Sequence, residues 1–489
     1  MPRTERIRGD MLRLLGLVTG VAFVVCLVLV LLGAARVLLY TQEDDAEHLA
    51  AKRAYLAALP DVSQQRPPNL VLILFDDLGY GDLGTTGSLS IATPAIDDLA
   101  RQGLRLTNYS SPAPNCTASR AGLLTGRYAP HTSLTQIVFP DDSPLTWLAK
   151  LMGAPIRLPA EEITLADALG AAGYRTFMAG KWHLGNQEPS RPIDMGFDSW
   201  LGVLYSNDME PLALWRDEEI VEAAPVDQSR LTQAYTEAAI EFLENTNGEP
   251  FFLYVAHSFP HIPLFPSVEH AGESAGGVYG DVVEDLDRSV GRIVEALDHL
   301  ELTEDTIVFV TSDNGPWFQG SAGTKIRGRK NSTFRGGQRV PAIVRWPNRI
   351  SMGVSDAMAM GIDLLPTMLE LLELPQPADR DLDGRSLTDV FLEDAPSPHT
   401  ILYSYAAGDL FALQGGRWRY RLRKGVELGS VRGLPFQPML DKGPWLFDLE
   451  LDADESYDVS KLHPEVFARF SNLAETQLAL DESNPRRWR

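Results

Sequence analysis

Short apolar runs alternate with amphipathic stretches along most of the chain. The runs Asn69–Phe75, Phe251–Ala256 and Thr306–Thr311 are almost entirely apolar and are bounded by turn residues. Strands of a parallel sheet that is covered on both faces have this pattern. Leu231–Glu244 and Val282–Leu300 instead place apolar residues at helical spacing, with charged residues between them. The alternation predicts an α/β fold with a large mixed, mostly parallel sheet sandwiched by helices.

The same pattern predicts several shorter elements, and it changes near the C-terminus. Helices are expected at 93–105, 163–173 and 363–372, and strands at 174–179 and 340–344. From about Asp381 onward, short β-like pieces at 402–405, 410–413, 418–422 and 446–449 precede an amphipathic helix at 464–480. We therefore expect a small C-terminal α+β subdomain in which an antiparallel sheet carries one helix.

The longest apolar run lies close to the N-terminus. Residues 14–35 are almost uninterrupted Leu, Val, Gly and Ala, and a helix of about 20 such residues crosses a bilayer. Four arginines precede the run and acidic residues follow it: Arg3, Arg6, Arg8, Arg13, Glu43, Asp44, Asp45 and Glu47. The positive-inside rule then keeps the N-terminus cytoplasmic and exports the remainder. A cleaved signal peptide is the alternative, although its apolar region usually spans about 7–15 residues.

Charge and cysteine usage narrow the function classes. The net charge of −23 argues against a nucleic acid partner, whose phosphates would be repelled. The chain contains only Cys26, inside the apolar run, and Cys116. No disulfide framework is therefore possible in the exported part, which is typical of a bacterial periplasmic-side protein rather than an exported animal protein.

Two of the predicted strands end in carboxylates. Asp76 and Asp77 directly follow Phe75, and Asp313 and Asn314 follow the strand at 306–311. Ligands of open α/β sheets bind beyond the carboxyl ends of the strands. An all-oxygen set of this kind selects Ca²⁺ or Mg²⁺ over softer metals. A turn or helix-cap role accounts for one such pair seen alone, but two converging strand ends favour a cation site.

Another candidate site is the stretch Asn115–Tyr128, which reads N-C-T-A-S-R-A-G-L-L-T-G-R-Y. Cys116 stands four residues before Arg120, at the start of a helix-like patch. A helix N-terminus and a nearby guanidinium both stabilise the anionic forms of a thiol. The alternative for an isolated cysteine is a small buried hydrophobe.

Basic and imidazole side chains follow other predicted strands. Lys181 and His183 lie in G-K-W-H-L-G after the strand at 174–179, and His261 lies in H-S-F-P-H-I-P-L after Phe251–Ala256. The loop at 323–339 is rich in Gly, Lys and Arg. Its basic residues suit an anionic ligand or a solvated surface equally well.

The chain resembles the sulfatase family. C-T-A-S-R followed by L-L-T-G-R is similar to the sulfatase signature, whose cysteine a separate enzyme oxidises to formylglycine. Other stretches match sulfatases in the expected order, and the resemblance covers nearly everything after residue 68: D-D-L-G-Y-G-D, G-K-W-H-L-G, Y-S-N-D, H-I-P-L, S-D-N-G, R-W-R-Y and L-F-D-L-E. The likeness is to the arylsulfatase A-like branch and implies an alkaline phosphatase-like fold. It also implies hydrolysis of sulfate monoesters, R-O-SO₃ to R-OH and sulfate.

The resemblance implies a role for each matched residue. It assigns a divalent cation, normally Ca²⁺ with Mg²⁺ as the alternative, to Asp76, Asp77, Asp313 and Asn314, with formylglycine from Cys116 contacting the metal. Arg120 is expected to hold the hydrated aldehyde. The residues expected around the sulfate are Lys181, His183, Ser206, His261 and Lys330. Two positions depart from the family pattern, since Ala118 replaces a common Pro and Arg335 replaces a common Glu. The second departure leaves Lys325 as an alternative to Lys330.

The implied chemistry distributes these residues over two steps. Asp313 is expected to take the proton of the attacking hydroxyl, while His261 or Lys330 protonates the leaving alcohol. His183 then deprotonates the second hydroxyl, which expels sulfate. Charge that develops on the sulfate oxygens is met by the metal, Arg120 and the two lysines.

The predicted organisation has five parts. They are a cytoplasmic N-terminus at 1–13, a transmembrane anchor at 14–35, a linker at 36–66, a sulfatase catalytic domain at 67–380 and a C-terminal subdomain at 381–489. Residues 42–68 are polar and Ala-rich and end in Arg-Pro-Pro, which predicts a short helix followed by a stiff linker. The expected partners are a sulfated small molecule or glycan, a formylglycine-generating enzyme and the membrane, but no nucleic acid. The substrate pocket is expected to include the loop at 137–159, because loops carry specificity.

Two other functions are open from the sequence alone. One is a phosphate or phosphonate monoester hydrolase, since related folds with the same metal geometry split phosphoryl esters. The other is a catalytically inactive protein that binds sulfated glycans. The intact set of site residues argues against the second.

Overall fold

The computed structural model describes residues 3–318, 326–422, 426–431, 434–440 and 443–489. Its contacts divide the chain into two compact units. One unit contains Met1–Glu43 and Phe139–Ile156, and the other contains Asp44–Val138 and Arg157–Arg489. The larger unit holds the sheets and every candidate site residue.

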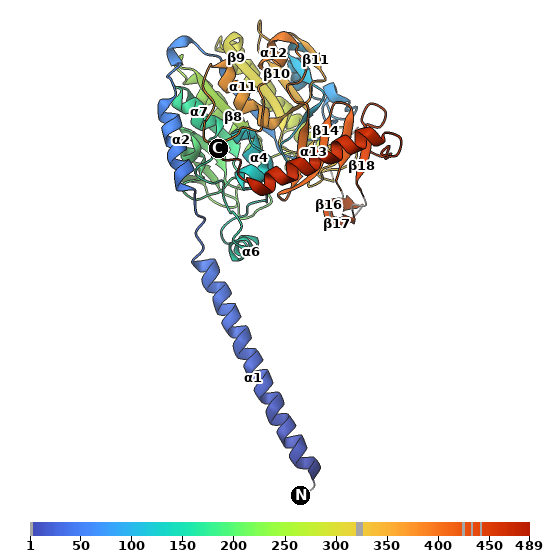
Figure 1. Cartoon of the computed structure of the whole chain (residues 1–489). Coiled ribbons are helices and arrows are strands. Elements are labelled where there is room, and N and C mark those ends of the chain that lie inside the picture. Colours follow the sequence, from blue (N-terminus) through green and yellow to red (C-terminus); the bar gives the residue numbers. More distant parts are fainter. Residues whose placement is uncertain (1–2, 319–325, 423–425, 432–433, 441–442) are drawn as a thin grey trace. The chain divides into compact units, whose positions relative to one another are not determined.

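A ten-stranded mixed sheet forms the centre of the larger unit within the described residues (Figure 1). In sheet order its strands are β11 (Gly353–Ser355), β2 (Leu104–Leu106), β10 (Ala342–Arg345), β9 (Thr306–Ser312), β1 (Asn69–Phe75), β8 (Phe251–Ala256), β4 (Arg175–Lys181), β5 (Ser199–Val203), β6 (Leu214–Arg216) and β7 (Glu219–Glu222). The five consecutive strands β9, β1, β8, β4 and β5 are parallel to one another. Their carboxyl ends therefore meet at one edge of the sheet.

Alternate residues of β1 face two separate hydrophobic cores. Val71 and Ile73 pack with residues of α3 (Pro94–Gln102), α8 (Leu231–Glu244) and α9 (Gly277–His299). Leu70 and Leu72 pack on the other face with residues of α4, α7 and α11. Those helices span Cys116–Thr125, Leu165–Ala171 and Leu364–Leu371. Burial on both faces explains why these strands are continuous apolar runs, and the predicted α/β sandwich is confirmed.

The C-terminal region forms the predicted small antiparallel sheet. Its strands pair in the order β13 (Leu402–Ala406), β14 (Asp409–Gly415), β15 (Trp418–Arg421) and β18 (Trp445–Asp448). α13 (Pro464–Ser483) packs on this sheet through Phe470 and Ala474. Two further pairs of strands are β12 (Ala359–Met360) with β3 (Tyr109–Ser110), and β16 (Val426–Val431) with β17 (Leu434–Leu440).

The N-terminal unit contains one long helix and one short helix. α1 (Arg3–Leu38) extends beyond both ends of the predicted run at 14–35. Its Leu15–Leu38 portion is long and apolar enough to cross a membrane, with a mean hydropathy of 3.0. α6 (Pro144–Met152) belongs to the same unit. The segment 139–156, which lies within the loop expected to line the substrate pocket, therefore groups with α1.

The segment 36–66, predicted as a linker with a short helix, contains the helix α2. α2 (Ala46–Ala58) is capped by Asp45, whose side chain accepts the backbone N–H groups of Glu47 and His48. Lys52 on this helix is buried, and its Nζ lies 2.7 Å from a carboxylate oxygen of Asp167. A buried lysine needs such a partner. The helix α2 is therefore packed within the larger unit.

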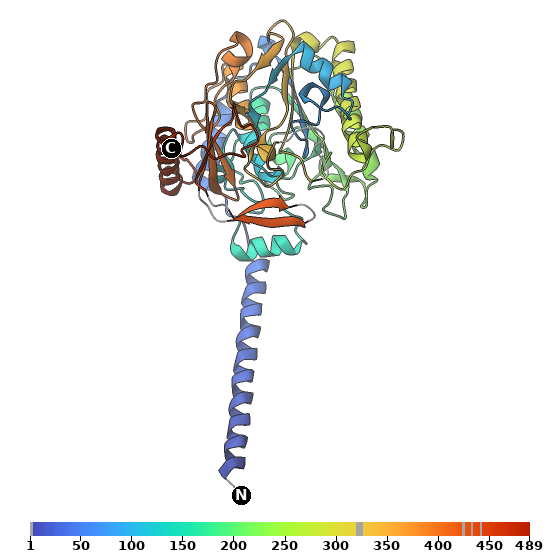
Figure 2. The same cartoon turned by 90° about the vertical axis from the view of Figure 1, so that its right-hand side faces the viewer.

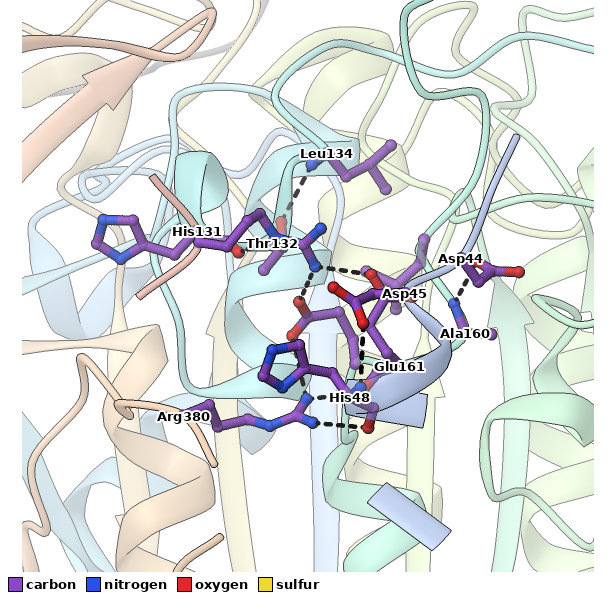
Figure 3. Close-up of polar contacts among 12 residues, drawn as sticks. Asp44, Asp45, His48, His131, Thr132, Leu134, Ala160, Glu161 and Arg380 are labelled. Carbon is purple, nitrogen blue, oxygen red and sulfur yellow. Dashed lines mark hydrogen bonds and ion pairs between the residues drawn. The ribbon is translucent and has the colours of Figure 1, made fainter. Parts of the chain in front are cut away.

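The last residues of the chain pack beside α2. The Trp488 ring stacks on His48 at 3.9 Å between ring centroids. Three guanidinium groups lie 4.5 to 4.8 Å from the Trp488 centroid, and they belong to Arg127, Arg380 and Arg486. Arg380 also donates to the backbone carbonyls of Glu161 and His48 (Figure 3). These contacts join α2 and the C-terminus to the rest of the larger unit.

Trp488→Ala is expected to lower the free energy of unfolding by about 2 kcal/mol, because stacking and several cation–π contacts are lost together. Urea unfolding measures this change. The matched control is Arg489→Ala, since the Arg489 side chain is 57% exposed and pairs with Asp381 at the surface. Equal midpoints for the two variants would contradict a stabilising role for the Trp488 ring.

Candidate active site

The five parallel strands bring the predicted site residues to one edge of the sheet. Each strand delivers residues at or just beyond its carboxyl end. They are Asp76 and Asp77 from β1, Asp313 and Asn314 from β9, Lys181 and His183 from β4, Ser206 from β5 and His261 from β8. Cys116 and Arg120 come from α4, and Lys330 comes from the loop before α10 (Arg335–Gln338). The structure therefore gathers all eleven residues.

Three carboxylates and the thiol form a tight buried cluster. One ligand atom each from Asp76, Asp77, Asp313 and Cys116 lies within 4.8 Å of all the others. Asn314 donates its amide N–H to Asp77 Oδ1 at 2.7 Å. Among the described residues, the Oδ1 of Asn314 has no hydrogen-bond partner although it is buried. Three carboxylates and an unsatisfied amide oxygen fit a hard divalent cation.

The electrostatics of the cluster also suit a cation. Burial and the neighbouring Asp76 carboxylate raise the pKa of Asp313 to about 7. Burial opposes ionisation of Asp76 too, but Lys181, His261 and Arg120 hold its pKa well below the usual value. Asp77 adopts a left-handed backbone conformation with φ of 67°. Strain in a non-glycine residue is typical of functional sites, and crowded like charges are stabilised by a bound cation.

Cys116 occupies the first position of α4. Asn115 caps this helix, and its side-chain oxygen accepts the N–H of Ala118 at 3.1 Å. The Cys116 Sγ lies 3.0 Å from Lys330 Nζ and 3.4 Å from Asp76 Oδ1. Burial and the Asp76 charge raise the pKa of the thiol well above its usual value. An unmodified Cys116 is therefore neutral and a poor nucleophile at physiological pH.

Arg120 lies one turn further along α4 and is fully buried. Its Nε and Nη2 lie 2.9 and 2.8 Å from Asp313 Oδ2. Its Nη1 donates to the backbone carbonyl of Lys181 at 2.7 Å. The guanidinium is thus fixed between two strand ends, where a preorganised positive charge is most effective.

A chain of polar contacts links Lys181, Ser206 and His261. Lys181 Nζ forms an ion pair with Asp76 and donates to Ser206 Oγ at 3.1 Å. His261 Nε2 lies 3.4 Å from Ser206 Oγ and 3.8 Å from Asp77 Oδ2. Burial and the charge of Lys330 lower the pKa of His261. These three side chains line the cluster on the β4, β5 and β8 side.

His183 is arranged as a neutral base. It has a φ of 63°, and its Nε2 donates to the Val138 carbonyl at 3.1 Å. This donation places the ring proton on Nε2, and the buried Nδ1 has no partner within the part of the chain that the structure describes. Burial and the charges of Lys181 and Arg120 lower the pKa of His183 well below its usual value.

Lys330 reaches the cluster from the long loop before α10. Its Nζ lies 2.9 Å from Asp77 Oδ1 and 3.0 Å from Cys116 Sγ. Burial would lower the pKa of Lys330, but the Asp77 carboxylate raises it well above the usual value. Lys330 therefore lies beside the cluster of carboxylates and the Cys116 thiol. The alternative Lys325 lies outside the described residues.

Glu455, a residue that the sequence analysis did not single out, contacts the backbone at Arg335, while the Arg335 guanidinium donates to the Ala453 carbonyl at 3.3 Å. Glu455 is fully buried and accepts the backbone N–H of Arg335 at 2.6 Å through Oε2. Its Oε1 lies 2.8 Å from Arg419 Nε, and its carbonyl accepts from Arg327. The C-terminal region thus supplies a carboxylate to the loop that carries Lys330. No local pattern in the sequence marks Glu455, because its partners Arg335 and Arg419 lie in other parts of the chain.

Glu455→Gln is expected to lower the free energy of unfolding by about 3 kcal/mol, because it leaves the buried Arg419 without its carboxylate. Urea unfolding measures the change. Glu450→Gln is the matched control, since Glu450 pairs with Arg417 at the surface, where a pair contributes less than about 1 kcal/mol. A loss no larger than that of the control would contradict the role of Glu455.

Comparisons with known proteins agree with this geometry. The family model described as Sulfatase matches residues 68–374. The chain is 36% identical over 388 residues to mouse N-acetylgalactosamine-6-sulfatase. The aligned region covers 73% of this chain and 72% of the relative. It is 34% identical over 479 residues to human arylsulfatase A, with coverage of 88% and 92%. The solved PsFucS1 sulfatase from Pseudoalteromonas sp. is 25% identical with a TM-score of 0.78, covering 91% of this chain and 98% of its own.

The match spans the whole catalytic sheet, and the aligned relatives are enzymes that cleave sulfate esters. Both the fold and the clustered residues fit this assignment. We conclude that the chain belongs to the sulfatase family and is a hydrolase of sulfate monoesters.

Proposed function

We propose that this enzyme hydrolyses its sulfate ester with a formylglycine made from Cys116 and with a bound Ca²⁺. The observation that supports the proposal is the convergence of Asp76, Asp77, Asp313 and Cys116 atoms within 4.8 Å. Asn314 completes the oxygen set. Mg²⁺ binds oxygen ligands as well, but a crowded all-protein set with three carboxylates suits Ca²⁺ better.

When bound, the cation and the hydrated aldehyde would supply positive charge beside the sulfate and a hydroxyl nucleophile for sulfur. The chain's own residues do the remaining work. Arg120, held by Asp313 and the Lys181 carbonyl, orients the hydrated side chain at position 116. Lys181, Ser206, His261 and Lys330 are proposed to bind the sulfate oxygens, which gain charge as the ester bond breaks.

Proton transfer is assigned to three positions. Asp313 would accept a proton from the attacking hydroxyl. His261 or Lys330 would donate a proton to the leaving alcohol oxygen. His183 would accept, at the buried Nδ1 that has no partner among the described residues, the proton whose removal releases sulfate.

The proposed substrate is a sulfated carbohydrate or aryl ester outside the cytoplasm. The names of the relatives include an aminosugar sulfatase and an arylsulfatase. We propose that α1 is an uncleaved single-pass anchor whose arginine-rich start stays cytoplasmic. The catalytic unit would then face the periplasm of a bacterial cell, where a formylglycine-generating enzyme acts on Cys116. The divisions at 67–380 and 381–489 stay predictions.

Peptide mass spectrometry across Cys116 tests the proposal in protein expressed with its native maturation enzyme. The expected mass corresponds to replacement of CH₂SH by CHO. The same preparation is assayed on paired aryl sulfate and aryl phosphate esters, with faster cleavage of the sulfate expected. An unmodified thiol in active enzyme contradicts the formylglycine assignment, and faster cleavage of the phosphate contradicts the proposed substrate preference.

A further inference from the structure

Helix α6 presents an apolar face to its surroundings. Five of its nine residues are large hydrophobic side chains that are 40% to 71% exposed: Leu145, Trp147, Leu148, Leu151 and Met152. At helical spacing these side chains cover one continuous side of the helix. A surface helix normally exposes polar residues to solvent. α6 instead exposes its apolar side.

The polar side chains of α6 are turned inward. Thr146 is buried, and its hydroxyl donates to the backbone carbonyls of Phe139 and Pro140 at 2.9 and 2.8 Å. Lys150 Nζ forms a 3.3 Å ion pair with Asp141. Both polar groups are therefore used to hold the helix in place, and the apolar side is left outward.

α6 packs against the C-terminal end of α1, where the apolar stretch ends (Figure 2). The Tyr40 hydroxyl donates to the Ala154 carbonyl at 2.8 Å, and Gln42 accepts the N–H of Ile156 at 2.9 Å. A Cβ atom at Gly33 would lie 3.7 Å from Leu151 Cδ1. These contacts place the exposed face of α6 next to the lipid-facing surface that α1 would have in a bilayer.

We propose that α6 lies in the headgroup region of the membrane as a second, interfacial contact beside the α1 anchor. This inference rests on the proposed anchoring by α1. Amphipathic helices with Leu and Trp on one side bury that side at the boundary between headgroups and acyl chains. Trp147 suits this depth because tryptophan favours the membrane interface. α6 and α1 together hold the N-terminal unit on the bilayer.

The arrangement favours lipid over a protein partner. The α6 face continues directly from the apolar surface of α1, whose Leu15–Leu38 window has no buried residue. If a protein covered α6, one continuous apolar surface would contact lipid along α1 and protein along α6. Arg36, in the last turn of α1, gives the unit a cationic group near the headgroup phosphates.

The test uses the full chain in vesicles of phosphatidylcholine and phosphatidylglycerol. In a Cys26→Ser background, single cysteines are introduced by Leu148→Cys, Leu27→Cys and Glu244→Cys and labelled with an environment-sensitive fluorophore. Cys116 is buried and does not react with the label. Position 27 reports on α1, and the exposed position 244 on α8 is the aqueous reference. Quenchers attached to lipid chains and a water-soluble quencher are compared at each position.

The label at position 148 is expected to be blue-shifted and quenched by the lipid-attached probe, as at position 27 and in contrast to position 244. Quenching at 148 by the aqueous probe alone, with lipid quenching at 27, overturns the inference and leaves the α1 anchor standing. Shielding of 148 from both quenchers indicates a protein partner or a second copy and also overturns it. Aqueous quenching at both 27 and 148 overturns the anchor itself.

A variant of the helix face gives an independent readout. Leu148→Asp with Leu151→Asp places two charges on the apolar side and is expected to remove the blue shift of a label at position 152. The matched variant Leu148→Ile with Leu151→Ile keeps the face apolar and is expected to retain it. Retention of the shift in the charged variant overturns the inference. Hydrolysis of a small soluble aryl sulfate is expected to be unchanged, because α6 contributes no residue to the site.

Discussion

Replacement of Cys116 by alanine is expected to abolish sulfate ester hydrolysis, with a loss on the order of 10⁴-fold or more in kcat. Position 116 would supply the only covalent nucleophile of the proposed reaction. The remaining site groups bind and polarise sulfate but cannot replace an attacking oxygen at the same place. The measurement is steady-state hydrolysis of an aryl sulfate by purified, Ca²⁺-loaded protein.

Two controls separate lost chemistry from lost structure. Position 116 is buried, but alanine lacks only the sulfur of the thiol or the oxygen of the aldehyde, so urea unfolding is expected to change by less than about 1.5 kcal/mol. Ala118→Pro is the matched change within the same motif, since it restores the residue common in the family, and it is expected to remain active. Substantial turnover by the Cys116→Ala protein would refute the formylglycine mechanism.

The strand-end residues were predictable from sequence because parallel topology determines where they meet. The runs that became β1, β8 and β9 are apolar at successive positions, and only strands covered on both faces require this. Once those strands are parallel neighbours, Asp76 and Asp313 must lie at the same edge. The resemblance then assigned a role to each residue, and the structure brings these residues together.

Other features depended on contacts between distant parts of the chain. Glu455 lies 120 residues from Arg335, and no local pattern connects the two. The segment 139–156 was expected within a substrate loop because loops carry specificity, and its contacts group it with α1. A short helix was expected within the linker region, but the burial of its Lys52 depends on Asp167, which lies far along the sequence. Tertiary pairing, and not local propensity, decided each case.

Removal of the cation is expected to have the second largest effect. Treatment of the enzyme with a chelator should lower kcat/KM by a hundredfold or more, on the order of 3 kcal/mol in transition-state stabilisation. Added Ca²⁺ should restore the activity. Asp77→Asn should lose activity to the same extent without recovery, because it removes the carboxylate that contacts Asn314 and Lys330 and one of the three carboxylates of the cluster.

Metal content distinguishes this explanation from a general loss of structure. Asp77→Asn protein is expected to contain well under one Ca²⁺ per chain by elemental analysis after dialysis. Asp287→Asn is the matched control, because Asp287 is also a buried carboxylate and instead accepts the N–H groups of Ala95 and Ile96 at the start of α3. That variant should keep its Ca²⁺ and its activity even if its stability falls. Full metal content in the Asp77→Asn protein would show that the cation is held elsewhere, since a site built on three carboxylates cannot lose one and retain its affinity.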